Sequence, residues 1–389
     1  MRIYLDYNAT APPYPDAVEA VARVMRDDFG NPSSVHAFGQ RAKAILDEAR
    51  GGVAALVDAD PGEVVFTSGG TEADNLALRG AAEALEAGGR RRRLVTTGIE
   101  HEAVLSTVKA LERRGWTVTT LPVPATGILR PDALAAAIDG GTALVSVMHA
   151  NNEIGTIQPV AELAAIARAH GALFHTDAVQ SVGKIPVSAR ALGVDLLSLS
   201  AHKFGGPKGA GALWIRRGVR LMPYATGGRQ ERNRRAGTEN VAAIAGMGVA
   251  ARHALEALTA RAAAIAALRD RLETGILETV PGTAVNGDRV SRVPNTTNIG
   301  FDGIEAESLL IALDLEGVAV STGSACSSGS LEPSHVLRAM GLPHARARNS
   351  LRFSLGPSTT AAEVDFVLSV LPRLTAKLRR LGRTAAALG

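Results

Sequence analysis

The stretch 143–177, ALVSVMHANNEIGTIQPVAELAAIARAHGALFHTD, decides the fold of this chain. Its pattern predicts a strand over Ala143 to Met148, a helix over Val160 to His170 and a strand over Ala172 to His175. A strand, a helix and a strand in this order are typical of parallel strands joined by a crossover helix. The same alternation extends outward from about Glu63 to Ile215, so we expect an α/β fold with a mostly parallel, doubly wound sheet.

Further strands and helices are predicted on both sides of this unit. The strands cover Val64 to Thr67, Leu94 to Thr97, Thr117 to Leu121, Leu196 to Leu199 and Gly211 to Ile215, and helices cover Glu72 to Ala87 and Ala103 to Arg114. After Ile215 a polar stretch, 227–237, precedes Ala-rich helices that extend to about Val280, and short strands mix with helices beyond them. We expect a large domain over residues 16–255 and a smaller α+β domain formed by residues 1–15 and 256–389.

Composition limits the class of protein. The chain has 389 residues, of which 46% are hydrophobic and 21% charged, as in ordinary globular proteins, and this length favours two packed units. A single cysteine, Cys326, excludes an intrachain disulfide and a cysteine-based zinc site, and it suits a reducing compartment. Neither a secretory signal nor an uncharged stretch of membrane-spanning length is visible, so we expect a cytoplasmic protein with no membrane partner. We also expect no bound metal.

The net charge of +4 and the pI near 9.4 would be compatible with a protein that binds nucleic acid. Much of the excess lies in two clusters, Arg90 to Arg93 and Arg229 to Arg235. Neither cluster is interleaved with aromatic residues, and no zinc-finger or helix-turn-helix pattern accompanies them. A solvated loop after a helix is the simpler interpretation of Arg90 to Arg93, and we expect no direct nucleic-acid partner.

The setting of Cys326 is unusual for a lone cysteine, which is more often an inert part of a core. It lies in the run STGSACSSGS over residues 321–330, which has no bulky apolar side chain that a core strand or amphipathic helix would need. Such a run predicts a mobile, solvent-reachable loop. A thiol on such a loop is placed for chemistry, because the thiolate must reach its target.

Polar residues follow the predicted strands, and ligands of open α/β sheets bind at the carboxyl ends of the strands. The residues in question are Ser68 to Thr71, Glu100-His101, Asn151-Asn152-Glu153, Asp177, Gln180 and Ser200-Ala201-His202-Lys203. The glycines at 69 and 70 open a helix and predict a phosphate cradle, although a simple helix cap explains them equally well. A cradle, a carboxylate, an imidazole and a lysine on one edge match the needs of pyridoxal phosphate.

These motifs together resemble the NifS/IscS-type cysteine desulfurases of the class V aminotransferase family, from Tyr4 to about Pro372. The resemblance depends on Tyr4-Leu5-Asp6, Phe29 to Ser34, Thr67 to Asn75, Asn151 to Gly155, His175 to Gln180, Ser200 to Lys203, Arg235 to Thr238 and Gly323 to Cys326. It implies pyridoxal-phosphate fold type I and a homodimer.

The resemblance also assigns roles to individual residues. Lys203 would hold the cofactor as a Schiff base, Asp177 would pair with its pyridine nitrogen, Gln180 would hydrogen-bond its phenolic oxygen and His101 would stack on its ring. The phosphate would be held by Gly70, Thr71, Ser200 and His202, with Thr238 reaching in from the partner subunit. Asn152 would also bind the cofactor. Arg352, assisted by Asn152, would bind the substrate carboxylate through its bidentate guanidinium.

By the same resemblance, the reaction converts L-cysteine to L-alanine. Lys203 would remove the α-proton, Cys326 would attack the substrate sulfur and become a persulfide, and His101 would manage the thiol proton. The sulfur would pass to an acceptor protein such as an iron–sulfur scaffold, while nitrogenase maturation, tRNA thiolation and DNA modification stay open.

The sequence also departs from the family pattern. Arg229 follows paired glycines where relatives commonly carry histidine, which puts the local dimer or phosphate-edge geometry in doubt. The end of the chain after Arg379 to Arg383 is shorter than in housekeeping relatives, and the stretches 237–240 and 330–335 favour the NifS side.

Three alternatives to a cysteine desulfurase stay open. A class V aminotransferase would share the fold, but it needs no mobile cysteine. A selenocysteine lyase is harder to separate, because selenium can leave without attack by a cysteine. A non-enzymatic partner-binding protein is disfavoured by the intact Lys203 and Cys326.

Overall fold

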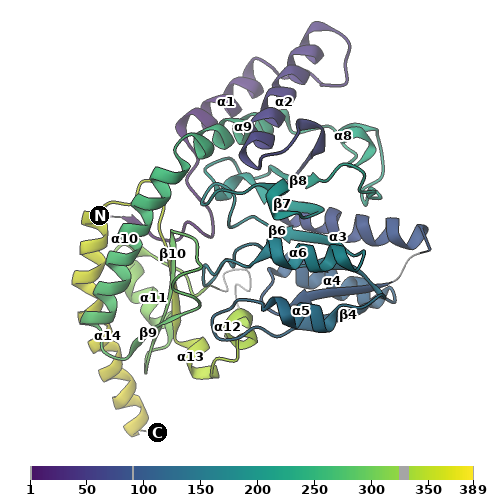
Figure 1. Ribbon diagram of the computed structural model, residues 1–389. Helices are drawn as coiled ribbons and strands as arrows, with labels where there is room; N and C mark the ends of the chain where they lie inside the picture. Colours follow the sequence, from purple (N-terminus) through teal and green to yellow (C-terminus); the bar gives the residue numbers. More distant parts are fainter. Residues whose placement is uncertain (1, 90–91, 324–332, 389) are drawn as a thin grey trace.

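The protein is described by a computed structural model that covers residues 2–89, 92–323 and 333–388, with residues 382–388 described by backbone alone (Figure 1). A twisted central sheet lies between layers of helices, and a smaller sheet lies beside it against the long helices α10 and α14. The N-terminus lies beside these two helices in Figure 1.

The described strands are β1 (Ile3–Tyr4), β2 (Val64–Thr67), β3 (Arg93–Thr97), β4 (Thr117–Leu121), β5 (Thr142–Ser146), β6 (Leu173–Asp177), β7 (Leu196–Ser200), β8 (Gly211–Ile215), β9 (Thr283–Asn286), β10 (Thr296–Phe301), β11 (Val318–Ala319) and β12 (Ser350–Ser354). The helices are α1 (Pro15–Arg26), α2 (Ala37–Leu56), α3 (Gly70–Ala87), α4 (Glu102–Arg113), α5 (Pro131–Ala137), α6 (Val160–Ala169), α7 (Ala189–Leu192), α8 (Gln230–Asn233), α9 (Val241–Glu256), α10 (Leu258–Thr279), α11 (Ala306–Leu315), α12 (His335–Ala339), α13 (His344–Arg348) and α14 (Ala361–Leu388). Short 3-10 helices cover Pro61–Glu63 (η1) and Ala201–Lys203 (η2).

The central sheet has the strand order β2-β8-β7-β6-β5-β3-β4 within the described residues. Strands β7, β6, β5, β3 and β4 pair in parallel, while β8 is antiparallel to both of its neighbours. This confirms the mostly parallel, doubly wound sheet that the sequence predicts. The strand that the sequence places over Ala172 to His175 instead runs over Leu173–Asp177, so Asp177 is the last strand residue rather than the start of a loop.

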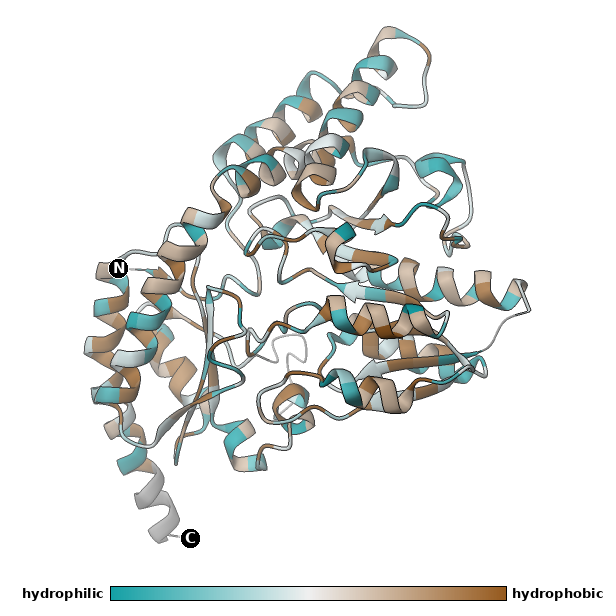
Figure 2. Ribbon diagram, viewed as in Figure 1, coloured by the Kyte–Doolittle hydropathy of each residue, from teal (hydrophilic) through white to brown (hydrophobic). Residues whose placement is uncertain are grey.

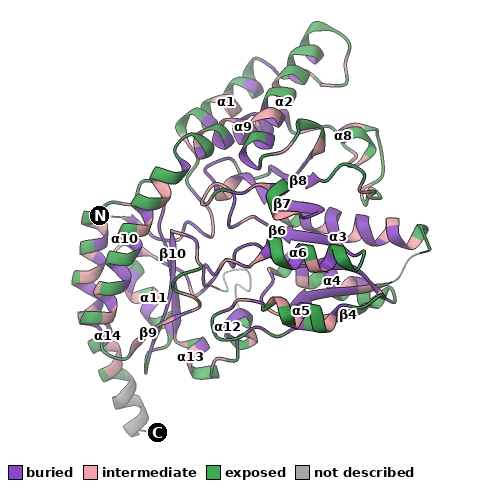
Figure 3. Ribbon diagram, in the orientation of Figure 1, coloured by how far each residue is buried: buried purple, intermediate pink, exposed green. Residues whose placement is uncertain are grey.

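Burial of the central strands follows from helices on both faces of the sheet. Every residue of β5, β7 and β8 is buried, and Figure 3 shows these strands as a buried layer between helices with exposed outer sides. Parallel strands covered on both faces are built from continuous apolar runs rather than alternating ones. The helices carry hydrophobic and hydrophilic stripes instead, as Figure 2 shows, because only one side of each helix meets the sheet.

A second apolar core lies under the smaller sheet. Strands β12, β10 and β9 form this antiparallel sheet, and the buried Phe301 and Phe353 join residues of α10, α11 and α14 in one cluster. The predicted domain boundaries, 16–255 against 1–15 with 256–389, stay a prediction. Within the described residues, Tyr14 and the buried residues of α12 and α13 depart from this division, because they pack against the core of the central sheet.

The arginine-rich stretch from Arg229 to Arg235 is anchored inside the protein. Glu231 is buried, and both of its carboxylate oxygens accept hydrogen bonds from Arg50, at 2.7 and 2.8 Å. Its Oε2 atom also accepts from the backbone N–H of Phe66 in β2, at 2.9 Å. The Nε atom of Arg235 donates to Glu72 of α3 at 2.8 Å. The stretch therefore braces the edge of the sheet next to the helix that follows β2.

Across the described ranges, no single helix is both long and apolar enough to cross a membrane. Helices α9 and α10 meet the length and composition criteria only as a pair, and they are bent by 76° relative to each other.

Candidate active site

A cavity of about 270 Å³ lies at the carboxyl ends of the central strands. Most of the predicted cofactor residues line it together: Gly70, Thr71, His101, Asn152, Asp177, Gln180, Ser200, His202 and Lys203. Ala9, Asp74, Met148 and Val179 complete the lining. Six segments that are far apart in the sequence therefore meet at one point, as the crossover topology predicts.

The start of helix α3 forms one end of this cavity. The helix begins at Gly70, and a Cβ atom built on Gly70 would lie 2.9 Å from Val179 Cγ2 and 3.5 Å from Ser200 Cβ. The distance to Val179 is shorter than a real Cβ contact, so glycine lets the backbone approach this side chain closely, whereas the distance to Ser200 is an ordinary van der Waals contact. Backbone N–H groups at the start of an 18-residue helix, next to Thr71 and Ser200, form the chemistry of a phosphate site.

Asp177 also lines the cavity, at the end of β6. Its Oδ1 atom accepts a hydrogen bond from the Val179 N–H at 2.9 Å. Burial, assisted by the neighbouring carboxylate of Asp74, raises the pKa of Asp177 to about 6. A cationic ring nitrogen beside Asp177 would lower this pKa again, so the carboxylate suits a protonated pyridine as partner.

The two histidines of the site are held by local contacts. His101 caps helix α4, and its Nδ1 atom accepts from the Ala103 N–H at 3.1 Å, which leaves the ring proton on Nε2 when the ring is neutral. His202 shares a hydrogen bond with Thr10 Oγ1 at 3.1 Å. Burial and the nearby Lys203 lower the pKa of His202 to about 4, so His202 is neutral at physiological pH.

Lys203 is held by a residue that the sequence analysis missed. Its Nζ atom donates to the backbone oxygens of Asn8 at 2.6 Å and Ala9 at 2.9 Å. Asn8 is buried, and its backbone oxygen also accepts from Gln180 Nε2 at 3.0 Å. Asn8 comes shortly after the Tyr4-Leu5-Asp6 motif, but it follows no strand of the central sheet, so the strand-end rule could not find it.

Arg352 approaches the site through Asn152. Its Nη1 atom donates to the Asn152 backbone oxygen at 2.8 Å, and its Nη2 atom contacts Asp6 Oδ1 at 2.6 Å. Arg352 does not line the cavity in this conformation, so its role toward a substrate carboxylate stays a prediction. Thr238 is exposed in the loop before α9 and is not brought to the cavity of its own chain. Cys326 lies outside the described residues.

The described residues on either side of 324–332 are tied to the site by Glu153. This buried carboxylate accepts a hydrogen bond from Ser334 Oγ, and a Cβ on Gly323 would lie 2.8 Å from its Oε2 atom. His335 shares a hydrogen bond with the backbone oxygen of Glu100 at 2.9 Å. Both flanks of the segment that contains Cys326 therefore lie close to the segments of Glu100, His101 and Glu153.

The residues of the cavity fit pyridoxal phosphate on evidence within the structure. A buried oxygen of the cavity lining, Asn152 Oδ1, has no hydrogen-bond partner among the described residues, whereas the buried Asp74 Oδ1 lies 3.5 Å from His175 Nε2. Buried polar atoms are seldom left unpaired, which indicates a polar ligand. A helix start for phosphate, a carboxylate for a ring nitrogen and a lysine for an aldehyde supply the complementary groups. No group of three or more potential metal ligands occurs in the described part of the chain.

The buried carboxyl of Glu100 makes the stability of the folded protein depend on pH. The side chain is fully buried and accepts from Thr97 Oγ1 at 2.6 Å and from the Met148 N–H. Burial raises its pKa from 4.5 to about 8. Between these values the folded protein keeps a proton that the unfolded chain has lost, so rising pH lowers the stability that Glu100 contributes.

Glu100→Gln is therefore expected to become stabilising relative to the original protein as pH rises from 6 to 8. The amide still accepts the hydrogen bonds but cannot ionise, and the difference should grow by about 2 kcal/mol over this interval. Urea unfolding of the cofactor-free proteins at fixed concentration measures it. Glu102→Gln, at the exposed first residue of α4, is the control. An unchanged difference between the two pH values would contradict the buried, protonated carboxyl.

Comparisons with known proteins agree with this site. Residues 3–367 match the family described as aminotransferase class-V. A cysteine desulfurase of Nostoc sp. (strain PCC 7120 / SAG 25.82 / UTEX 2576) is 51% identical over 379 residues, which cover 97% of this chain and 94% of that protein. A solved structure described as a NifS-like protein matches with a TM-score of 0.91 at 38% identity, covering 97% of this chain and 100% of that one. The structure described as SspA in complex with cysteine has a TM-score of 0.81 at 35% identity and covers 92% and 100%.

The chain belongs to the aminotransferase class-V family of pyridoxal-phosphate-dependent enzymes. Within that family its near relatives, at about half identical residues over nearly the whole chain, are cysteine desulfurases. The resemblance noted in the sequence is thereby confirmed, together with the fold, the enzymatic class and the cofactor.

Proposed function

We propose that this protein converts L-cysteine to L-alanine and transfers the sulfur to Cys326 as a persulfide. The observation that carries the proposal is the meeting of Lys203 and Asp177 in one cavity beside the start of α3. Full-length relatives named cysteine desulfurase and the structural relative described in complex with cysteine support the substrate. An aminotransferase would use the same cavity without Cys326.

Lys203, Asp177 and Gln180 would hold the cofactor, with Gly70, Thr71, Ser200 and His202 at its phosphate and Thr238 contributed by the partner subunit. Bound there, pyridoxal phosphate supplies an electron sink that acidifies the α-proton of the amino acid and weakens its carbon–sulfur bond. Lys203 Nζ moves the α-proton, because its two backbone hydrogen bonds direct the amine into the cavity. Asp177 sustains the positive charge of the ring nitrogen, and His101 stacks on the ring and exchanges the thiol proton.

The sulfur transfer balances without an external oxidant. The carbon–sulfur bond of cysteine breaks, a sulfur–sulfur bond forms with the thiolate of Cys326, and the carbon takes up a proton to give alanine. The substrate sulfur is oxidised while the carbon is reduced by the same electron pair. Arg352 would bind the substrate carboxylate with Asn152, exchanging its contact to Asp6 for the substrate.

The setting of the reaction belongs to the same proposal. The protein would work in the cytoplasm as a homodimer, and the persulfide would pass to an acceptor protein such as an iron–sulfur scaffold. The single cysteine and the reducing compartment that it suits support this setting. The departure at Arg229 lies next to the braced stretch at Glu231, outside the cavity.

Incubation of the cofactor-loaded protein with L-cysteine and a reducing thiol is expected to release alanine and sulfide in equal amounts. Amino-acid analysis and a sulfide assay measure the two products. Pyruvate or an amino-group acceptor requirement would instead indicate an aminotransferase or a β-lyase. A rate on L-selenocysteine far above the rate on L-cysteine would favour a selenocysteine lyase.

A further inference from the structure

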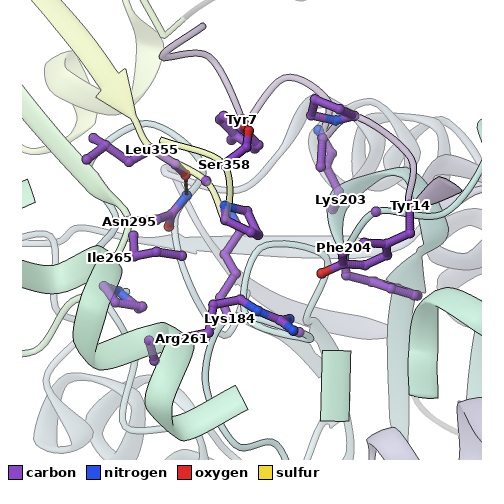
Figure 4. A pocket seen from close by; sticks show the side chains of 18 of the residues that line it. Tyr7, Tyr14, Lys184, Lys203, Phe204, Arg261, Ile265, Asn295, Leu355 and Ser358 are labelled. Atoms are coloured by element: carbon purple, nitrogen blue, oxygen red, sulfur yellow. Dashed lines mark hydrogen bonds between the residues drawn. The ribbon is translucent and has the colours of Figure 1, made fainter. Parts of the chain in front are cut away.

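A second lysine, Lys184, lies beside the candidate active site. It lines a mostly apolar cavity of about 220 Å³, whose other lining residues include Tyr7, Tyr14 and Phe204 (Figure 4). Lys203 lines this cavity and the cofactor cavity alike. The two lysines are therefore close neighbours, although the proposed reaction uses only Lys203.

Lys184 determines which way two amide groups face. Its Nζ atom donates to Gln180 Oε1 at 2.5 Å and to Asn8 Oδ1 at 2.7 Å. Each partner presents its carbonyl oxygen to this amine and not its NH2 group, because Gln180 Nε2 donates to the Asn8 backbone oxygen and Asn8 Nδ2 donates to Asn152 and Thr296. The amide of Gln180 is thereby fixed with Nε2 on the other side.

The fixed amide of Gln180 leaves one N–H group for a ligand. Its Nε2 atom donates one hydrogen bond, to the Asn8 backbone oxygen at 3.0 Å, and Gln180 lines the cofactor cavity. The same Asn8 oxygen accepts from Lys203 Nζ at 2.6 Å. Asn8 therefore joins Lys184, Gln180 and Lys203 in one continuous set of hydrogen bonds.

The charges and burial around Lys184 are consistent with an amine that acts as a hydrogen-bond donor within the protein. Burial lowers the pKa of Lys184 well below its usual range, and the positive charges of Lys203 and Arg352 lower it further. The uncharged amine still has two N–H groups, which is the number that the two contacts need. An anionic ligand in the neighbouring cavity would restore the ammonium and strengthen both contacts.

We propose that Lys184 is a positioning residue that orients the Gln180 amide toward the cofactor and, through Asn8, supports the Lys203 amine. The inference rests on the proposed function, because it takes Gln180 to hydrogen-bond the phenolic oxygen of pyridoxal phosphate. Lys184 touches neither the cofactor nor the substrate in this assignment and acts through Gln180 and Asn8.

A double-mutant cycle tests this inference on cofactor binding alone. Pyridoxal phosphate is titrated into cofactor-free protein and its visible absorption gives the dissociation constant. Lys184→Met and Gln180→Ala are each expected to weaken binding about tenfold, the typical effect of one lost hydrogen bond to a polar ligand. The double variant is expected to bind more tightly than the product of the two single losses predicts, because both changes remove the contact of Gln180 with the cofactor. Lys109→Met, at an exposed lysine of α4, is the matched control.

The outcomes separate this inference from the proposed function. Losses that multiply in the double variant, or unchanged affinity in Lys184→Met, would overturn the role of Lys184. Failure of the original protein to bind pyridoxal phosphate would instead overturn the proposed function. Thermal unfolding of each cofactor-free variant reports folding, and Lys184→Gln replaces Lys184→Met in the cycle if the methionine variant does not fold.

Discussion

Lys203→Ala is expected to lower the rate of alanine formation from L-cysteine by at least about a thousandfold. Loss of a positioned general base alone costs about 10²–10⁴-fold, and this variant also loses the amine that holds the cofactor. Asn8 and Ala9 hold that amine by their backbone oxygens. The amine of the neighbouring Lys184 already donates hydrogen bonds to Gln180 and Asn8.

Two measurements check this expectation. Alanine is quantified over time with the cofactor in excess, and borohydride reduction followed by peptide mass analysis locates the cofactor-labelled lysine. The label should fall on Lys203 in the original protein and vanish from that peptide in the variant. Lys109→Ala on the exposed face of α4 should match the original protein in both. More than a tenth of the original rate in Lys203→Ala would contradict the assignment.

Cys326→Ala is expected to lower sulfide release by at least about a hundredfold while leaving pyridoxal phosphate bound. The proposed reaction breaks the carbon–sulfur bond by attack of this thiolate, so removal of the nucleophile stops the chemical step. Cofactor binding is assigned to residues that line the cavity at the strand ends, and the proposed reaction gives Cys326 a role in the sulfur step alone. The variant therefore separates the sulfur step from the cofactor site.

The single cysteine makes the persulfide unambiguous to detect. After brief exposure to L-cysteine, alkylation and mass analysis should find one extra sulfur atom on the peptide that contains Cys326, because no other cysteine exists in the chain. Ser324→Ala, two residues away in the same run, is the control and should retain the persulfide. Undiminished alanine formation by Cys326→Ala would contradict the mechanism and favour a lyase that needs no cysteine.

The sequence predicts the strands of the central sheet closely. Strands β2, β4 and β8 have the predicted bounds, and the predicted helices begin within two residues of α3, α4 and α6. Apolar runs and helical periodicity are local signals, and covering layers on both faces make them strong in this sheet. The small differences occur at the ends, as at β6, where the strand continues through Asp177 because β7 extends beside it.

The candidate site was also largely predictable, because strand-end positions and motif residues converge in any parallel sheet. Nine of the cofactor residues that were predicted in this way line one cavity in the structure. Asn8, Lys184 and Asp74 were missed because nothing in their local sequence distinguishes them. Asn8 contributes through contacts to Lys203 and Gln180, which lie 195 and 172 positions away along the chain.

The sequence by itself determined the parallel sheet, the lysine and carboxylate at its edge and the family of the protein. Periodicity and motifs are properties of neighbouring residues, and the local backbone follows from them. Only the tertiary structure decided that Lys184 donates to the Gln180 amide, that Arg352 contacts Asp6, and that burial raises the pKa of Glu100. Such facts depend on distance and burial, which arise only when remote segments pack together and exclude water.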